Sequence, residues 1–230
     1  MKSAISLSLV LAMVMAGSAL GVVTLGEDDL APAPFRGEDG TTAQAWYFDQ
    51  YTGTTGIAPD IVDSPGAPVV DMIGGFLDNT VYLPTDYDQQ GVWIVDAGTA
   101  EQGDWERTSE MRIYLPNIEQ QNDVKKIWLQ VVYYAQEGKA PNVYVLPEGD
   151  DTQPVPKMEV VGDPTPLGDM YYHAVFELEL PFNPFWEYVY IRPRDCQVYI
   201  DSVLLETQCI PEPLTFGLLG IGGLFLRRRR

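Results

Sequence analysis

The chain has little of the chemistry that most enzymes use. Among 230 residues it contains one histidine, His173, and two cysteines, so no pair of histidines can hold a catalytic metal. The Gly-x-Ser-x-Gly sequence around a hydrolase nucleophile is also missing. Two carboxylates suffice for glycoside hydrolysis, but 33 acidic residues single out no pair. We therefore expect a protein that is not an enzyme. A glycan hydrolase or lyase is the least favoured of the three functions that we consider.

Positive charge is scarce as well. The sequence has 14 Lys and Arg residues against 33 Asp and Glu, which gives a formal net charge of -19. Five of the basic residues lie at the two ends, so the chain between them carries 9 basic against 33 acidic residues, a net charge near -24. Such a surface repels phosphate backbones. We expect no nucleic acid as a partner, whereas divalent cations, cationic polymers or neutral glycans fit this charge.

Long apolar runs occur only at the ends. The start, "MKSAISLSLVLAMVMAGSALG", has Lys2, an apolar core and then the small residues Gly17, Ala19 and Gly21. This order is typical of a secretory signal peptide, and the polar "GEDD" that follows disfavours a buried N-terminal helix. We expect a helical signal peptide over residues 1–21, cut after Ala19 or Gly21, and an exported body.

The apolar run near the C-terminus is too short for a comfortable membrane span. Leu214 to Leu226 is 13 residues long, against the ~17–25 of a transmembrane helix, and four glycines weaken it. The basic residues after it, Arg227, Arg228, Arg229 and Arg230, favour a cytoplasmic C-terminus and an acidic body outside. The pattern predicts a short transmembrane helix that tethers the protein transiently to the inner membrane.

The order of features from residue 209 to 230 resembles a known sorting signal. Pro211, Glu212 and Pro213, a short apolar helix and an arginine cluster together resemble the PEP-CTERM signal of Gram-negative bacteria. The resemblance implies an exosortase, a membrane-embedded cysteine protease, and the secretion machinery as partners. It also implies cleavage near the motif and release to the cell surface or extracellular matrix. A plain tail anchor is the alternative.

The body, residues 22–208, has the pattern of strands. Short segments such as "GVWIVD", "KKIWLQVVYYA" and "FWEYVYIR" are rich in β-branched and aromatic residues and are separated by Pro, Gly, Asp or Asn. No helical period is sustained among them. We expect one all-β domain, an antiparallel β-sandwich of the jelly-roll-like kind.

Alternation predicts which faces are buried. In "MYYHAVFELEL", residues 170–180, the even-numbered residues from Tyr172 to Leu180 form an apolar face. His173, Glu177 and Glu179 point the other way, so His173 is expected to be an exposed polar residue. Residues 127–134 are partly apolar on both faces, which predicts a central strand. The segment "FRGEDGTTAQAWYFD" is similar to an N-terminal pattern of exported PEP-CTERM proteins of uncharacterised function. We expect Trp46 and Phe48 to pack into the sandwich there.

One strand, "FWEYVYIRPR", carries candidate ligand residues. Trp186, Tyr188 and Tyr190 alternate and so share one side, with Arg192 close by. A pyranose stacks its C–H face on such rings, and an arginine donates hydrogen bonds to hydroxyls or uronates. The other interpretation, which the apolar Val189 and Ile191 do not exclude, places the rings in the core, and we favour it. Exposure of the row decides between the two.

Two further features are weaker signals. Oxygen ligands for a structural Ca²⁺ could come from the acidic loop residues Glu148, Asp150 and Asp151 or from Asp201 in a strand. Solvated loops are the simpler interpretation, and no other cofactor is expected. Asp201 resembles the last-strand Asp of jelly-roll carbohydrate-binding modules. Cys196 and Cys209 fit an oxidising compartment, but a straight strand between them would hold the thiols much further apart than the ~6 Å Cα spacing of a disulfide.

The expected function is that of a non-enzymatic structural or adhesive protein of the cell surface or extracellular matrix. The alternative is a carbohydrate-binding module for extracellular polysaccharide. An exposed row of aromatic side chains would favour the second, and facing carboxylates across a groove would favour an enzyme.

Overall fold

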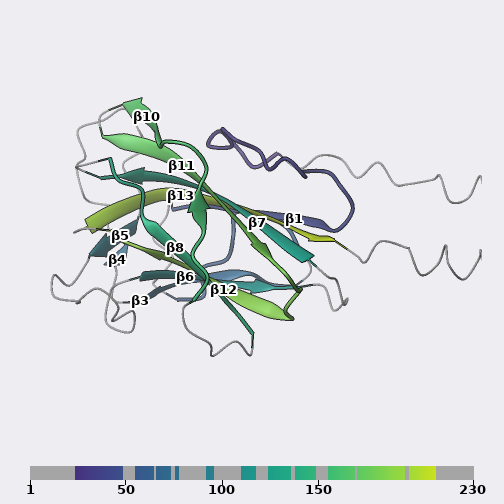
Figure 1. Cartoon of the computed structure of the whole chain (residues 1–230). Coiled ribbons are helices and arrows are strands. Elements are labelled where there is room, and N and C mark those ends of the chain that lie inside the picture. The colour runs from purple at the N-terminus through teal and green to yellow at the C-terminus, as the bar shows by residue number, and fades with distance from the viewer. Residues whose placement is uncertain are drawn as a thin grey trace, which may run out of the picture.

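The computed structural model describes residues 24–48, 55–64, 66–73, 76–77, 92–95, 110–117, 124–135, 138–148, 155–168, 170–194 and 197–210. These residues form thirteen strands and no helix, in two antiparallel sheets that pack face to face (Figure 1). The prediction of an all-β body is confirmed. The expected signal peptide, residues 1–21, and the expected sorting motif from Pro211 onward lie outside the described residues, whereas Cys209 and Ile210, which the sequence assigned to the sorting segment, end the last strand. Within the described residues nothing helical could cross a bilayer.

The larger sheet has nine strands and the smaller sheet has four. The members of the larger sheet are β1 (Thr41–Tyr47), β2 (Ile61–Asp63), β4 (Phe76–Leu77), β5 (Val92–Val95), β7 (Val124–Tyr134), β9 (Glu159–Val160), β10 (Thr165–Gly168), β11 (Tyr171–Leu180) and β13 (Gln197–Ile210). They run in the order β10-β11-β7-β13-β1-β2; in addition β9 pairs with β11, and β5 pairs with both β4 and β13. The smaller runs β3 (Val69–Ile73), β6 (Glu110–Pro116), β12 (Trp186–Arg192), β8 (Asn142–Pro147).

Strand β7 is central, as its two apolar faces predict. It pairs along its length with β11 on one side and β13 on the other, so that Leu129 lies opposite Phe176 and Leu205. From Lys125 to Tyr133, all but Lys126 are buried. A strand with partners on both edges and layers on both faces needs an almost continuous apolar run, which this segment supplies.

The main core fills the space between the two sheets. Trp46, Leu129 and Val203 point into it from the larger sheet, and Ile113, Val145 and Val189 point into it from the smaller one. Burial of this apolar surface is the main force that holds the sheets together. The predicted face of β11 is confirmed, because its even-numbered residues pack in this core, and so are the predicted positions of Trp46 and Phe48.

A buried ion pair crosses the same core. Lys125 on β7 contacts Glu187 on β12, and neither side chain is exposed to solvent. Asn117, which follows β6, donates to Glu187 and accepts from Lys125, and its amide also donates to the carbonyl of Pro184 at 2.7 Å. The pair therefore links the larger sheet to the smaller one through charge rather than through apolar contact.

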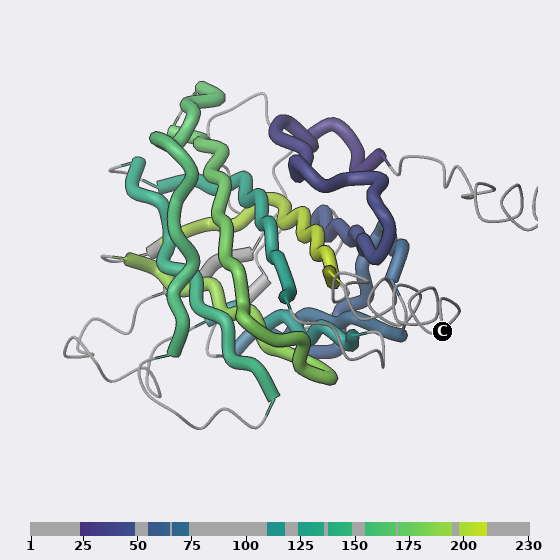
Figure 2. Tube along the Cα trace, turned by 45° about the vertical axis from the view of Figure 1, so that its right-hand side comes forward, coloured from purple at the N-terminus to yellow at the C-terminus, as the bar shows by residue number. Residues whose placement is uncertain are grey.

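A third layer covers the outer face of the larger sheet. Residues 24–40, which we call the N-terminal strap, fold back over this face before the chain enters β1 (Figure 2). Leu25, Ala33 and Phe35 of the strap are buried, the last two beside Trp128. Strap and sheet meet without a void at Gly26, whose φ is +89° and which lies against the Tyr47 ring. The strap thus buries the outer face where β1, β7 and β13 lie side by side, whereas β2, β9 and β10 stay largely exposed.

Candidate ligand-binding face

The outer face of the smaller sheet carries the aromatic row of β12. Alternation along the strand turns Glu187, Val189 and Ile191 into the core, where each is 0% exposed. Trp186 and Tyr188 point the other way and are half-buried, while Tyr190 is 7% exposed. The expectation that these rings belong to the core between the sheets is therefore not met: Val189 and Ile191 are the core side of this strand.

Neighbouring strands add two rings that the sequence did not single out. Tyr188 lies opposite Tyr114 on β6, and Tyr190 lies opposite Tyr144 on β8, so all of these side chains share one face. Both added tyrosines are half-buried. We call the five rings together the aromatic face: Tyr114, Tyr144, Trp186, Tyr188 and Tyr190. Only the pairing of three strands brings them together.

Tilted ring contacts join Tyr114, Trp186, Tyr188 and Tyr190. The centroids of Trp186 and Tyr188 are 5.2 Å apart with an interplanar angle of 65°, and those of Tyr188 and Tyr190 are 6.0 Å apart at 49°. Tyr114 lies 5.6 Å from Tyr188 and 6.2 Å from Trp186. Such tilted pairs are the favoured geometry for aromatic side chains. The contacts fix the rings in place before any ligand arrives.

Two arginines lie among the rings, and each has a carboxylate partner. The Cζ atom of Arg112 is 4.9 Å from the centroid of Tyr188, and Arg112 Nη2 is 2.9 Å from Asp71 Oδ2. Arg192 lies 5.5 Å from the Tyr144 ring and donates its Nε–H to Glu110 Oε2 at 2.7 Å. Cation–π contact and charge pairing together hold both guanidinium groups against the sheet.

The charges on this face cancel locally. Burial acts to raise the pKa of Asp71, but the hydrogen bond from Arg112, the Gly56 N–H and the Arg112 charge outweigh it, so that the pKa lies below its ordinary value. Burial raises the pKa of Glu110, and the Arg192 charge opposes this only in part. Burial also raises the pKa of Tyr190, which keeps its phenol neutral. The face offers neutral rings and two compensated guanidinium groups.

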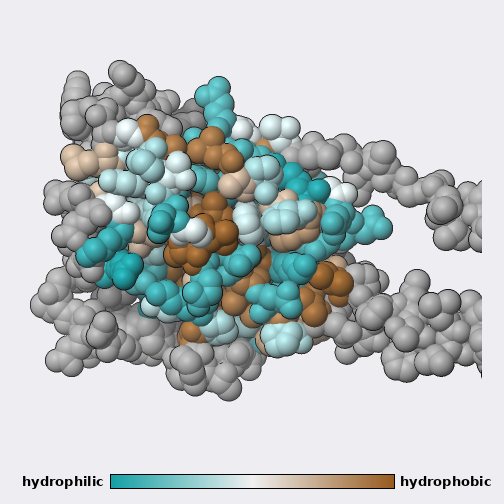
Figure 3. Space-filling view, turned by 45° about the horizontal axis from the view of Figure 1, so that its top comes forward, coloured by the Kyte–Doolittle hydropathy of each residue, from teal (hydrophilic) through white to brown (hydrophobic). Residues whose placement is uncertain are grey.

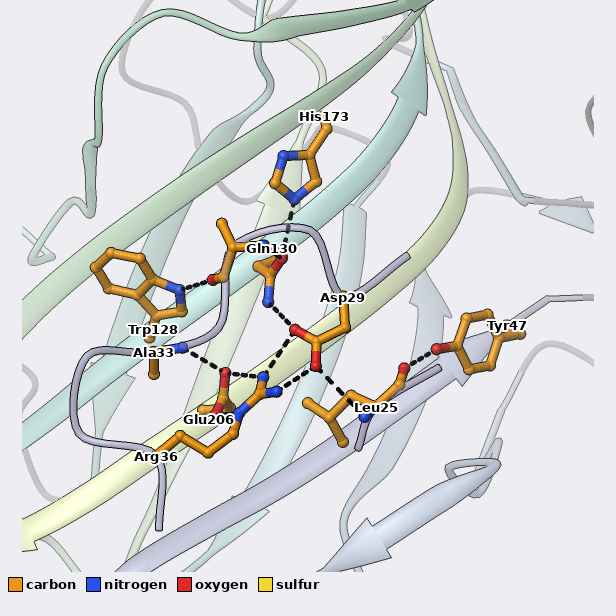
Figure 4. Close-up of polar contacts among 10 residues, drawn as sticks. Leu25, Asp29, Ala33, Arg36, Tyr47, Trp128, Gln130, His173 and Glu206 are labelled. Atoms are coloured by element: carbon orange, nitrogen blue, oxygen red, sulfur yellow. Dashed lines mark hydrogen bonds and ion pairs between the residues drawn. The ribbon is translucent and has the colours of Figure 1, made fainter. Parts of the chain in front are cut away.

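The opposite side of the molecule holds a closed polar network under the strap (Figure 4). Arg36 pairs with Asp29 of the strap and with Glu206 of β13, whose Oε2 also accepts the Ala33 N–H at 2.9 Å. Gln130 of β7 donates to Asp29 Oδ1 at 3.0 Å. These bonds give the arginine of the segment "FRGEDGTTAQAWYFD" a structural role, because Arg36 ties the strap to the sheet.

His173 belongs to this network, and the expectation that it is exposed is wrong. Its side chain is 4% exposed and its Nε2 lies 3.0 Å from Gln130 Oε1. The sequence places it correctly on the face away from the core, but the strap buries that face. Burial lowers the pKa of His173, although the charges of Asp28 and Asp29 act to raise it. The histidine thus has a structural contact within the network.

An acidic groove of about 520 Å³ opens beside the strap. Phe35 and Trp128 line it together with Lys126 and with four glutamates: Glu38, Glu159, Glu177 and Glu179. On the side of the molecule shown in Figure 3, hydrophobic and hydrophilic side chains are interspersed. Among the residues that the structure describes, no three His, Cys, Asp or Glu side chains are placed to hold a metal ion.

The remaining candidates are only partly described. Glu148 follows β8 in the smaller sheet, whereas Asp201 lies in β13 of the larger sheet, where the pairing with β7 shifts register. Asp150 and Asp151 lie outside the described residues, as do Cys196 and the sorting motif from Pro211 onward. Cys209 is buried, with its Sγ 3.3 Å from Asn183 Oδ1. The calcium site stays a prediction, and so does the expectation that a straight strand keeps the two thiols apart; β13 runs from Gln197 to Ile210 without folding back.

Comparisons with known proteins identify no family. No family model matches the chain, and no curated protein matches it. Among solved structures, one match is the K1 cleaved adhesin domain of Lys-gingipain from Porphyromonas gingivalis W83, with 11% identity and a TM-score of 0.37 over 71% of this chain and 97% of that domain. At this distance the match carries no argument about activity or ligand.

Proposed function

We propose that this protein is an exported, non-enzymatic protein of the cell surface or extracellular matrix that binds extracellular polysaccharide through its aromatic face. The observation that carries the proposal is the position of Trp186 and Tyr188. They lie half-buried on the outer face of the smaller sheet and not in the core between the sheets. An adhesive matrix role and a carbohydrate-binding module, which the sequence left as alternatives, become one function in this proposal.

The chemistry of the face suits sugars. Tryptophan and tyrosine rings offer a flat apolar surface to the C–H groups of a pyranose, while phenol hydroxyls and guanidinium N–H groups can pair with its hydroxyls. Arg112 is placed for this role because its side chain is 32% exposed beside Tyr188. The rings already hold one another, so a sugar would meet a surface whose side chains have little rotamer freedom left to lose.

A jelly-roll-like connectivity is part of the proposal. The chain passes repeatedly between the two sheets: β1 and β2 lie in the larger, β3 in the smaller, β4 and β5 in the larger again, and later strands continue to alternate. A glycan hydrolase or lyase stays behind this proposal, because the acidic groove has no feature that selects two of its glutamates as catalytic.

Export and sorting are also proposed, from the two ends of the sequence. A signal peptide at residues 1–21 and an exosortase acting near Pro211 would give a mature protein that starts near Leu20 or Val22. The intact mass of the protein released from the cell surface tests this. A released product that still carries Arg227 to Arg230 would show that sorting by cleavage does not occur.

Affinity electrophoresis in gels that contain envelope or matrix polysaccharides tests the glycan-binding proposal. Trp186→Ala and Tyr188→Ala should each abolish retention and leave the melting temperature nearly unchanged, since both rings are on an outer face. Phe185→Ala is the matched control, because Phe185 is 68% exposed and adjacent in sequence but lies before the strand. If the Ala variants of the row unfold the protein, or bind as the unaltered chain does, the proposal fails.

A further inference from the structure

We propose that the aromatic face takes a neutral glycan presented as a single soluble chain, and rejects both uronate-rich polymers and flat crystalline polysaccharide. The proposal rests on the function proposed above and names its ligand class. It follows from two separate observations: the pairing of both arginines with carboxylates, and the angles between the rings.

The arginines are not available as carboxylate receptors. Arg192 is 8% exposed and pairs through two nitrogens with Glu110, which is 7% exposed. A uronate that took this guanidinium would leave Glu110 buried without its partner, which is strongly unfavourable. Arg112 is more exposed, but it holds Asp71, whose Oδ1 also accepts the Gly56 N–H at 2.8 Å. Its Nε is buried, so only N–H groups on its Nη atoms can still donate to neutral hydroxyls.

The field of the whole chain acts in the same direction. With 9 basic against 33 acidic residues between its two ends, the chain repels polyanions as they approach. Screening at physiological salt weakens this repulsion beyond about 8 Å but leaves it at contact distance. An uncharged glycan meets neither the long-range repulsion nor the local competition with Asp71 and Glu110.

The ring angles decide the physical form of the ligand. A flat crystal surface can lie on several rings only when they are nearly coplanar. Here Trp186 and Tyr188 are inclined by 65°, Tyr188 and Tyr190 by 49°, and Tyr114 and Tyr188 by 55°. A single chain can turn about its glycosidic bonds and so present successive sugar faces at different angles. The face therefore fits a soluble chain.

The test compares one polysaccharide with and without its charge. The exported protein, as purified from cells, is run in affinity gels that contain a soluble uronic-acid polymer, the same polymer after reduction of its carboxyl groups to alcohols, or an uncharged soluble glucan or mannan. Pull-down on microcrystalline cellulose and chitin covers the flat surfaces. We expect retention by a neutral soluble glycan, at least roughly tenfold weaker retention by the unreduced uronic-acid polymer than by its reduced form, and no capture by the crystals.

Asp71→Asn tests the charge argument inside the protein. It frees the Arg112 charge, so binding of the unreduced uronate polymer should rise roughly tenfold while neutral binding changes little. Asp63→Asn, which removes an exposed charge on β2 of the other sheet, is the matched control and should leave both unchanged. Melting temperatures show whether both variants are folded; if Asp71→Asn is not, the reduced-polymer comparison decides alone.

The outcomes separate this inference from the function on which it rests. Retention by no glycan of any kind overturns glycan binding itself. Equal or tighter retention by the unreduced uronate polymer overturns the ligand class and leaves glycan binding standing. Capture by crystalline polysaccharide without retention by soluble chains overturns the argument from the ring angles.

Discussion

Replacing Lys125 by methionine should strongly destabilise the fold. The substitution keeps most of the side chain's volume but removes the only cation beside Glu187 that the structure describes. Glu187 is 0% exposed, so in the variant its carboxylate would be left charged in the core, or it would have to take up a proton. Breaking a buried pair in this way costs about 3–5 kcal/mol of unfolding free energy.

That cost should be easy to measure. For a domain of this size it corresponds to a fall in melting temperature of roughly 6–20 °C, because 1 kcal/mol shifts the midpoint by about 2–4 °C. Urea unfolding followed by tryptophan fluorescence gives the free energy directly. Lys126→Met is the matched control: the neighbouring lysine points to the outer face and is half-buried, so its loss should change stability by less than about 0.5 kcal/mol.

The double variant Lys125→Met with Glu187→Leu should recover most of the loss in stability, since replacing a whole buried pair by apolar side chains is often neutral or better.

The pH dependence of stability gives a second check. Burial raises the pKa of Glu187 above its ordinary 4.5, and without the lysine it rises further. Near pH 4.5 the carboxyl is protonated in the folded variant, so the deficit of Lys125→Met should be small there and grow towards neutral pH. A deficit below about 1 kcal/mol at pH 7, or one independent of pH, would refute this reasoning.

Three further outcomes are expected. Arg36→Met should cost about 3–5 kcal/mol in urea unfolding, because it leaves two buried carboxylates without their cation, and strap amides should exchange hydrogen faster than in the unaltered protein. His173→Gln should flatten the pH profile of stability. In the unfolded chain the histidine takes up a proton as the pH falls below its ordinary pKa of 6.5, whereas burial lowers its pKa in the folded protein. The unaltered protein therefore loses stability as the pH falls below 6.5, and the variant should not. Gly40→Ala should be more destabilising than Gly56→Ala by thermal melting; both have positive φ, but only at Gly40 would a Cβ meet a backbone atom, 2.5 Å from the carbonyl oxygen of Cys209.

The sequence predicted the strands and their inward faces well where the alternation was strong. In β11 the even-numbered residues are apolar without a break, and in β7 both faces are largely apolar, so the burial of these apolar residues follows from the pattern alone. The same pattern could not reveal that Lys125 and Glu187 meet inside the core. Each lies on the inward face of its own strand, but the strands belong to different sheets, and no local pattern states which positions will oppose each other.

For β12 the alternation divided the strand into two sides but did not say which side is inward. Both sides carry apolar or aromatic residues, so hydrophobicity alone favours the burial of neither side over the other. The structure decides for Val189 and Ile191 because they meet Ile113 and Val145 in the core, and it places Tyr114 and Tyr144 beside the row. Neither tyrosine was predictable as a neighbour, since strand pairing joins positions more than 40 residues apart.

By itself the sequence determined the all-β class, the central position of β7, the inward face of β11 and the acidic charge of the body, because each follows from periodicity or composition within a short stretch. Only the tertiary structure decided that the strap buries His173, that Arg36 is held between Asp29 and Glu206, and that five rings and two compensated arginines share one outer face. These features need residues from distant strands to come within a few ångströms, and that proximity is set by sheet order and by the packing of whole layers.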